Sequence, residues 1–394
     1  MNRSAWLFVF LCISAVASAD GQQTRDSEGN PAAATDVAKP NDPFFDKQYY
    51  FEKMHVLEAW AITRGSPEVL IGVVELGFDA SHEEFQKGNV EVYQVPGMKH
   101  DPEDWRSRNH GTQIVGTIIA EAGNGKGIAG LAPDCRVLVA EVGTDEGYDT
   151  LVGGTGTEKG SGTPNPETRV FTKDGEAIRY LTDRGCKVIN ISGIVQSIIK
   201  PDLEYAIAHD VVLVVASGNA NKPHPFFPKD VSPALIVGGL EPNDERWVDE
   251  HLTRNGEIFS GSNYGEGLDV MAPCRDIIFC THNSARDKGL LPKDHWMDTN
   301  FGPQRQGYCH RINGGGTSGA APMATALVAL IRSIRPDLDC EAVIGIVQQG
   351  ADDLGEQGWD EYTGYGRINF RRSLEIAQAW PKNNQSKQAA EAVP

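Results

Sequence analysis

Residues 69–85 read Val-Leu-Ile-Gly-Val-Val-Glu-Leu-Gly-Phe-Asp-Ala-Ser-His-Glu-Glu-Phe, an apolar run that ends in a carboxylate. A run such as Leu70 to Val74 is typical of a strand that is buried on both faces of a parallel sheet. Glu75 follows this strand directly, so a charge is presented where the strand meets its loop. A lone loop carboxylate is most often solvated. Glu75 therefore counts as a candidate functional residue only if partners for it occur elsewhere in the chain.

The same kind of run recurs along the chain and indicates the fold class. Near-continuous apolar segments occupy residues 137–142, 187–191, 211–216 and 234–238, and helical patterns occupy residues 174–184 and 203–209. Strands that alternate with helices predict an α/β fold with a doubly wound, mostly parallel sheet and helices on both faces. Active sites on this architecture lie beyond the carboxyl ends of the strands, which is where Glu75 is expected.

Charge restricts the partners of the protein. The chain has 394 residues, of which 40% are hydrophobic and 23% charged, with a formal net charge of -18. This composition is that of a globular protein. The negative charge argues against nucleic acid and anionic membranes as partners.

The termini differ in composition from the rest of the chain. Arg3, the apolar run 5–16 and Ala17-Ser-Ala19 have the pattern of a signal peptide cleaved after Ala19. The apolar run is shorter than the roughly 20 residues that a membrane span needs. We therefore expect a secreted or periplasmic protein with no membrane span: a signal peptide over residues 1–19, a polar linker over 20–40, one domain over 41–380 and a disordered tail over 381–394. Six cysteines follow the signal, and either disulfides or buried thiols are compatible with them.

Two further motifs supply partners for Glu75. Asn109-His110-Gly-Thr112 precedes a small-residue helical stretch, and residues 313–325 read Asn-Gly-Gly-Gly-Thr-Ser-Gly-Ala-Ala-Pro-Met-Ala-Thr at the start of an apolar helix that ends near Ile334. The ordinary interpretation is a surface histidine, with Thr317 or Ser318 as a helix N-cap. However, the order Glu75, His110, Ser318 is the acid–His–Ser order of subtilisin. Residue 320 is Ala, so the α/β-hydrolase motif G-x-S-x-G is absent.

With these motifs the chain resembles the subtilisin-like serine proteases over nearly the whole of residues 41–380. The matching segments are Asn109–Thr112 with Gly127–Pro133, Ala216–Asn219, Phe259–Gly265 with Leu268–Pro273, Gly315–Ala324 and Gly364–Asn369. The resemblance implies an endopeptidase that acts on polypeptides through an acyl-enzyme and needs no cofactor for its chemistry. It implies Ser318 as nucleophile, His110 as base, Glu75 as the triad acid and Asn219 as the oxyanion donor.

Two departures from the family pattern bear on activity. The position of Glu75 normally holds Asp, and the extra methylene moves the carboxylate by about one bond length, which can cost on the order of 10²-fold in rate. The resemblance also implies substrate-binding residues at the ends of two strands, namely Ser192, Gly193, Ile194, Ser217 and Gly218. The family usually has Leu-Gly-Gly after Ser192, and here Gly193-Ile194 stands instead. Ile194 either narrows the substrate site or is a harmless rearrangement.

The resemblance also implies a metal site and a disulfide. In the family a calcium ion lies between the loop after the His helix and a carboxylate after the acid motif. Glu84 and Asn124 stand at those positions. Cys280 and Cys309 fall on two antiparallel arms before the serine motif, and a Cys280–Cys309 bond is expected there. Long loops at residues 144–167 and 283–307 are further differences, and the second is expected at the rim of the site.

Two functions remain open from the sequence. One is an exported serine endopeptidase, which intact His110, Ser318 and Asn219 favour. The other is a catalytically weak or inactive relative that binds peptides or partners, which Glu75 and Ile194 favour. The sequence leaves the substrate preference and the oligomeric state open.

Overall fold

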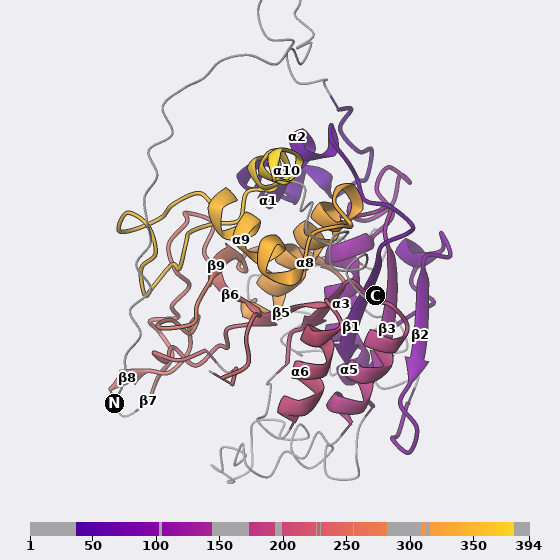
Figure 1. Cartoon of the computed structure of the whole chain (residues 1–394), viewed down its shortest axis with the longest axis horizontal. Coiled ribbons are helices and arrows are strands. Elements are labelled where there is room, and N and C mark those ends of the chain that lie inside the picture. Colours follow the sequence, from indigo (N-terminus) through magenta and orange to yellow (C-terminus); the bar gives the residue numbers. More distant parts are fainter. Residues whose placement is uncertain are drawn as a thin grey trace, which may run out of the picture. The chain divides into compact units, whose positions relative to one another are not determined.

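Seven parallel strands form the central sheet, in the order β2-β3-β1-β4-β5-β6-β9 (Figure 1). The structure is a computed structural model that describes residues 37–101, 105–143, 173–193, 199–225, 227–228, 230–254, 256–281, 309–312 and 315–381. The sheet strands are β1 Leu70–Glu75, β2 Val90–Gln94, β3 Arg136–Glu141, β4 Val188–Ile191, β5 Val212–Ala216, β6 Leu235–Leu240 and β9 Val270–Pro273. The expected doubly wound, mostly parallel α/β fold is confirmed.

Helices and short hairpins complete the described chain. The helices are η1 Phe45–Lys47, α1 Tyr50–Lys53, α2 Val56–Trp60, η2 Glu83–Phe85, α3 Trp105–Ile119, α5 Asp174–Asp183, α6 Lys200–Ala208, α8 Thr317–Ile334, α9 Cys340–Gly350 and α10 Phe370–Ala379. Two small antiparallel pairs are β7 Thr253–Arg254 with β8 Glu257–Ile258, and β10 Ile277–Cys280 with β11 Cys309–Ile312.

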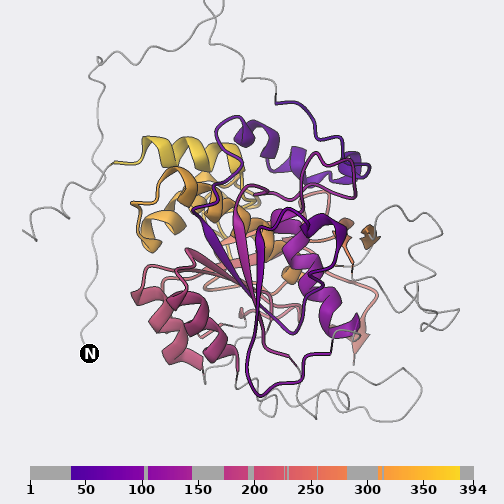
Figure 2. The ribbon, with the colours of Figure 1, turned by 90° about the vertical axis from the view of Figure 1, so that its right-hand side faces the viewer.

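The strands are buried on both faces because successive side chains enter two different cores. Ile71 and Val73 of β1 belong to the core shared with α3 and α8. Leu70 and Val74 belong to the core shared with α5 and α6. Figure 2 shows α5 and α6 on the opposite side of the strands from α3. The uninterrupted apolar runs in the sequence thus reflect a sheet that is covered on both sides.

The connections of β1 explain where a site forms. β1 lies between β3 and β4, so the chain winds away from it in both directions. Ligands of doubly wound sheets bind at such a switch point, beyond the carboxyl ends of the strands. Glu75 is the last residue of β1, beside Glu141 at the end of β3.

Helix α3 begins earlier than the sequence indicated. It starts at Trp105 rather than after Thr112, and His110 therefore lies inside the helix. Tertiary contacts account for the extra turns. The Arg108 side chain donates to the carbonyls of Asp101 and Phe78, and the Thr112 hydroxyl bonds to the Arg108 carbonyl.

Helix α8 is the one element within the described residues that is long and apolar enough to cross a membrane. It passes that test by length and composition alone, and 83% of it is buried inside the protein. It is the central core helix, packed against β4, β5, β6 and β9.

Candidate active site

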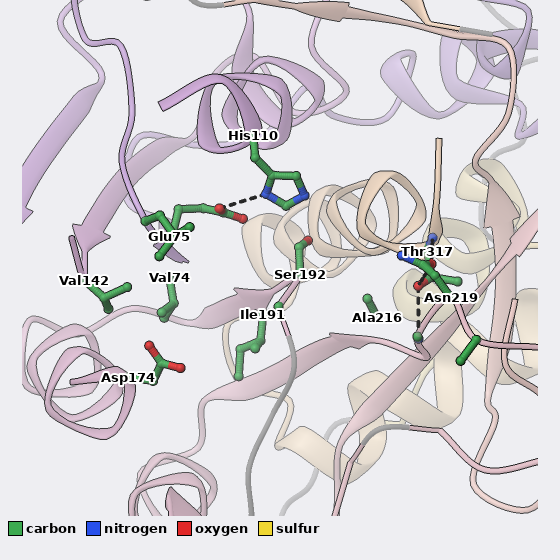
Figure 3. A pocket seen from close by; sticks show the side chains of 14 residues that line it. Val74, Glu75, His110, Val142, Asp174, Ile191, Ser192, Ala216, Asn219 and Thr317 are labelled. Carbon is green, nitrogen blue, oxygen red and sulfur yellow. Dashed lines mark hydrogen bonds and ion pairs between the residues drawn. The ribbon is translucent and has the colours of Figure 1, made fainter. Parts of the chain in front are cut away.

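Glu75 and His110 are joined by a hydrogen bond at the carboxyl end of β1. The distance from His110 Nδ1 to Glu75 Oε2 is 2.9 Å, and Figure 3 shows the two side chains pointing toward each other. Glu75 is 6% exposed, whereas the His110 side chain is 40% exposed. A buried carboxylate that holds one ring nitrogen leaves the other nitrogen available toward the solvent side.

The close approach of α3 to β1 depends on the glycine after His110. A Cβ at Gly111 would clash with the carbonyl oxygen of Gly77 and would lie 3.1 Å from the Glu75 Cβ. Thr112 fastens the same contact, because its hydroxyl accepts a hydrogen bond from the Asp79 N–H at 3.0 Å. The His-Gly-Thr sequence therefore fixes the histidine beside the strand end.

The second carboxylate oxygen of Glu75 lacks a donor. Oε1 is buried and has no hydrogen-bond partner among the described residues. Burial lowers the pKa of His110, but the charge of Glu75 and its hydrogen bond raise that pKa, and the net shift is upward. Glu75 therefore stabilises the protonated imidazole, as a triad acid does.

Asn219 lies at the end of β5 and contacts the first residue of α8. Its Oδ1 accepts hydrogen bonds from the Thr317 N–H at 2.9 Å and from the Thr317 hydroxyl at 2.8 Å. The helix thus has Gly316 as N-cap, without a side-chain cap from Thr317 or Ser318, because Asn219 satisfies the first N–H. Because these bonds engage the side-chain oxygen of Asn219, its Nδ2 group can donate a hydrogen bond to a ligand.

Gly316 is needed for this arrangement. A Cβ at Gly316 would lie 2.8 Å from both Nδ2 and Oδ1 of Asn219, which is closer than real Cβ contacts come. Gly316 therefore lets the segment after β5 and the start of α8 approach each other closely.

Ser318 is the second residue of α8, and a buried network supports its backbone. Pro322 has no N–H for the Ser318 carbonyl, and the Ser192 hydroxyl donates to that carbonyl instead, at 3.0 Å. Asn190 links this hydroxyl to Thr325 of the same helix. Among the described side chains, His110 bonds to Glu75 but forms no hydrogen bond with Ser318. Catalytic hydrogen bonds often form only once substrate is bound.

A cavity of about 430 Å³ opens beside these residues. It is lined by Val74, Glu75, Leu76, His110, Val142, Asp174, Ile191, Ser192, Gly193, Ala216, Gly218, Asn219, Ala220 and Thr317 (Figure 3). Of the expected substrate-binding residues, Ser192, Gly193 and Gly218 line it. A Cβ at Gly193 would meet nothing within 4 Å, so the space beside it is open.

The other two expected substrate-binding residues are Ser217 and Ile194. Ser217 is completely buried, and its hydroxyl bonds to the Asn263 carbonyl, so its side chain supports the strand end instead of lining the cavity. Ile194 lies outside the described residues, as do the loops 144–167 and 283–307. Asp174, Thr317 and Leu76 also line the cavity, and the sequence analysis did not predict this for any of them.

The expected calcium residues lie together away from this cavity. Asn124 Nδ2 donates to Glu84 Oε2 at 3.1 Å, and the Ile128 N–H donates to Glu84 Oε1. Asp42, which the sequence did not single out, accepts the N–H groups of Gly123 and Asn124. Burial raises the pKa of Glu84 to about 7, and the charge of Asp42 adds to that shift.

Carboxylate and amide oxygens are ligands of the kind calcium prefers. In this structure Asn124 turns its Nδ2 toward Glu84, and its Oδ1 accepts a hydrogen bond from the Lys126 N–H. Within the described residues no group of three or more His, Cys, Asp or Glu side chains surrounds a metal position. Carbonyl oxygens of the loop would therefore have to complete the shell. The residues present fit a calcium ion once the Asn124 amide turns its oxygen toward Glu84.

Comparisons with known proteins agree with the geometry. A thermophilic serine proteinase from Bacillus sp. (strain AK1) is 28% identical over 335 residues, which cover 84% of this chain and 68% of that protein. Thermitase from Thermoactinomyces vulgaris is 31% identical over 238 residues, 59% of this chain and 73% of thermitase.

The fold matches that of a solved protease as well. The crystal structure of fervidolysin from Fervidobacterium pennivorans, a keratinolytic enzyme related to subtilisin, superposes with a TM-score of 0.63 at 23% identity and covers 92% of this chain and 50% of that one. The sequence pattern of the Subtilase family, Peptidase_S8, matches residues 66–366. The chain belongs to the subtilase family of serine proteases.

Proposed function

We propose that this protein is an exported serine endopeptidase that uses Glu75 where its family has aspartate. The observation that carries the proposal is the Glu75–His110–Asn219 arrangement at one cavity. The carboxylate holds Nδ1 of the histidine at 2.9 Å, and the amide is held against the start of the helix that bears Ser318. Nothing in this chemistry calls for a cofactor, and the substrates are polypeptides.

These positions support the following reaction. The Ser318 hydroxyl attacks the peptide carbonyl, and His110 Nε2 takes the hydroxyl proton while Glu75 accepts a hydrogen bond from Nδ1–H. Asn219 Nδ2 and the Ser318 N–H donate to the oxyanion of the tetrahedral intermediate. His110 then protonates the leaving amine, and water hydrolyses the acyl-enzyme by the same route.

The alternative is a catalytically weak or inactive peptide-binding protein. Glu75 Oε1 favours it, because this oxygen has no donor among the residues that the structure describes, and a carboxylate without its full set of hydrogen bonds holds a charged imidazole less firmly. The relatives are named as proteases, which favours the enzyme.

Covalent labelling of Ser318 distinguishes the two functions. A fluorophosphonate probe should label the mature wild-type protein, and hydrolysis of a casein-derived peptide should be detectable. Ser318→Ala should lose both signals, and Ser333→Ala, on the same helix but outside the cavity, should keep them. Labelling that persists in Ser318→Ala, or no labelling of the wild type, would overturn the proposed function.

Calcium is proposed as a structural ion, held by Glu84, Asn124 and Asp42. Its role would be to bind the N-terminal segment and the loop after α3 together, away from the reacting groups. Peptide hydrolysis itself needs no metal in this arrangement.

Export is proposed from the signal pattern at residues 1–19. A relative described as a halolysin-like extracellular serine protease, from Natrialba magadii, is 25% identical over 84% of this chain and 52% of its own length. This name supports the same location for the present protein, either secreted or periplasmic.

A Cys280–Cys309 disulfide is proposed to accompany export. The two residues are direct partners in the antiparallel pair β10–β11, as the sequence predicted. The structure forms no disulfide among its described cysteines. Facing residues of such a pair have Cβ atoms about 4.5–5.5 Å apart, so a small movement closes the bond. Peptide mapping of the secreted protein without reductant should find the linked pair, and alkylation of both thiols would exclude it.

A further inference from the structure

Asp174 lines the catalytic cavity but has no role in the proposed reaction. It is the first residue of α5, on the side of the cavity that is built from β1, β3 and β4. Figure 3 shows it beyond Val74, with Val142 and Ile191 around it and Asn219 and Thr317 at the other end of the pocket. A carboxylate is thus enclosed by an otherwise apolar end of the substrate cavity.

The carboxylate of Asp174 faces no counter-charge from the described residues. It forms no hydrogen bond or ion pair with any residue in the part of the chain that the structure describes. Its neighbour Lys173 is committed elsewhere, to Glu176 at 2.7 Å. An acidic residue in the first turn of a helix is stabilised by the helix dipole. The exposed Glu176 in the same turn already provides this stabilisation, so the dipole does not explain why Asp174 lies in the cavity.

The surroundings penalise an unpaired charge at this position. Burial raises the pKa of Asp174 to about 7, and the negative charge of Glu75 adds to the shift. Glu75 already has His110 as its partner, whereas Asp174 has none within the described ranges. A cation that entered the cavity would remove this penalty, because it would give the carboxylate a charged hydrogen-bond partner.

We propose that Asp174 is a specificity residue that binds the basic side chain of a lysine or arginine in the polypeptide substrate. This inference rests on the proposed function, since it places a peptide in the cavity between Asn219 and Asp174. The aliphatic part of the basic side chain packs against Val74, Val142 and Ile191, and its charged end reaches Asp174. Long basic side chains bury their stems in this way while the charged end keeps a polar partner.

Two features of the molecule agree with a basic ligand. The formal net charge of -18 attracts cationic polypeptides to the protein at long range. The cavity is also open beside Gly193, where the added Cβ meets no atom within 4 Å, so a long side chain has room to enter.

Peptides that differ by a single charge test the proposal. A set of fluorogenic peptides carries lysine or norleucine at one position at a time on the amino-terminal side of the cleaved bond. At one position, wild-type kcat/KM should favour lysine over norleucine by about 10- to 100-fold, the range of a charge-assisted hydrogen bond. Asp174→Asn should lose most of that ratio, and Asp174→Lys should shift the preference at the same position to glutamate.

Glu176→Gln is the matched control, because it removes one carboxylate from the same helix outside the cavity. It should keep the lysine preference. A wild-type enzyme without a lysine preference at any position would overturn the proposal. A preference that survives in Asp174→Asn would do the same.

Measurements of peptide binding to inactive variants test the role of Asp174 even if the protein proves not to be a peptidase. Ser318→Ala and the double variant Ser318→Ala/Asp174→Asn are titrated with the same lysine and norleucine peptides. If the wild type proves inactive, the peptidase proposal fails, and the binding ratio of Ser318→Ala still decides the role of Asp174. Equal affinities of Ser318→Ala for the two peptides at every position would reject it.

Discussion

Glu75 meets His110 at an ordinary hydrogen-bond distance, so the longer side chain does not by itself misplace the carboxylate. The other oxygen, Oε1, is buried and finds no donor within the described part of the chain. The backbone around Glu75 is also tightly packed, because Gly111 lies against its Cβ and Cγ. The geometry therefore suits glutamate, and we expect that aspartate would be too short here by about one C–C bond, ~1.5 Å.

Two substitutions of Glu75 should distinguish the effect of its charge on activity from the effect of its side-chain length. Glu75→Gln should lower kcat by about 10³- to 10⁴-fold, because it removes the charge that holds the imidazole, and Glu75→Asp should lower kcat by about 10- to 100-fold, because its oxygen falls short. Peptide hydrolysis under saturating substrate measures both. If Glu75→Asp has a higher kcat than the wild type, the backbone at the end of β1 is not positioned for the longer side chain of glutamate.

The pH profile gives an independent signature of the same pair. His110 must be neutral to act as a base, so activity should rise with pH through its pKa. Glu75 raises that pKa, which places the midpoint above the ordinary histidine value. In Glu75→Gln only the effect of burial remains, and burial lowers the pKa, so the midpoint of the residual activity should move to lower pH. An unchanged midpoint would contradict the coupling.

At the scale of elements, the junction between β5 and α8 sets the oxyanion site. Gly316→Ala would place a Cβ 2.8 Å from the Asn219 amide and push that amide away from the Thr317 N–H. We expect kcat to fall by about 10²-fold, near the loss caused by removal of one oxyanion donor. Gly345→Ala in α9 is the matched control, because its Cβ meets only ordinary contacts at 3.9 Å or more. Full activity of Gly316→Ala would show that the glycine does not position Asn219.

The elements that the sequence predicted well are those whose pattern is set by burial alone. The apolar runs predicted β1, β3, β4, β5 and β6 within two residues at each end, and the small and apolar residues after Gly316 predicted that α8 ends near Ile334. No apolar run predicted β2, because its side chains are mostly exposed. The start of α3 was missed because the contacts of Arg108 stabilise it, and no periodicity records such contacts. Asp174 was missed for a similar reason: an acid at the start of a helix looks the same whether it faces solvent or a cavity.

At the scale of the whole molecule, three distant segments meet around Asn124. The N-terminal segment contributes Asp42, the turn after β1 contributes Glu84, and the loop after α3 contributes Asn124 with the N–H groups around it. Phe44 joins the same loop through its N–H to the Gly127 carbonyl. Two buried carboxylates at one loop favour a bound cation, which would fasten the start of the domain to its core.

Removal of calcium should therefore lower the thermal stability of the molecule. An ion at 100 times its Kd stabilises the folded state by about 2.7 kcal/mol, which corresponds to roughly 3 °C in Tm for a chain of this size. Calorimetry of the wild type in calcium and in excess chelator should show that difference. Glu84→Gln should have a Tm that chelator does not change, whereas Glu52→Gln, which removes an exposed carboxylate from α1, should respond like the wild type. If chelator leaves the wild-type Tm unmoved, the cluster is held by its hydrogen bonds alone, and the N-terminal segment needs no metal to stay in place.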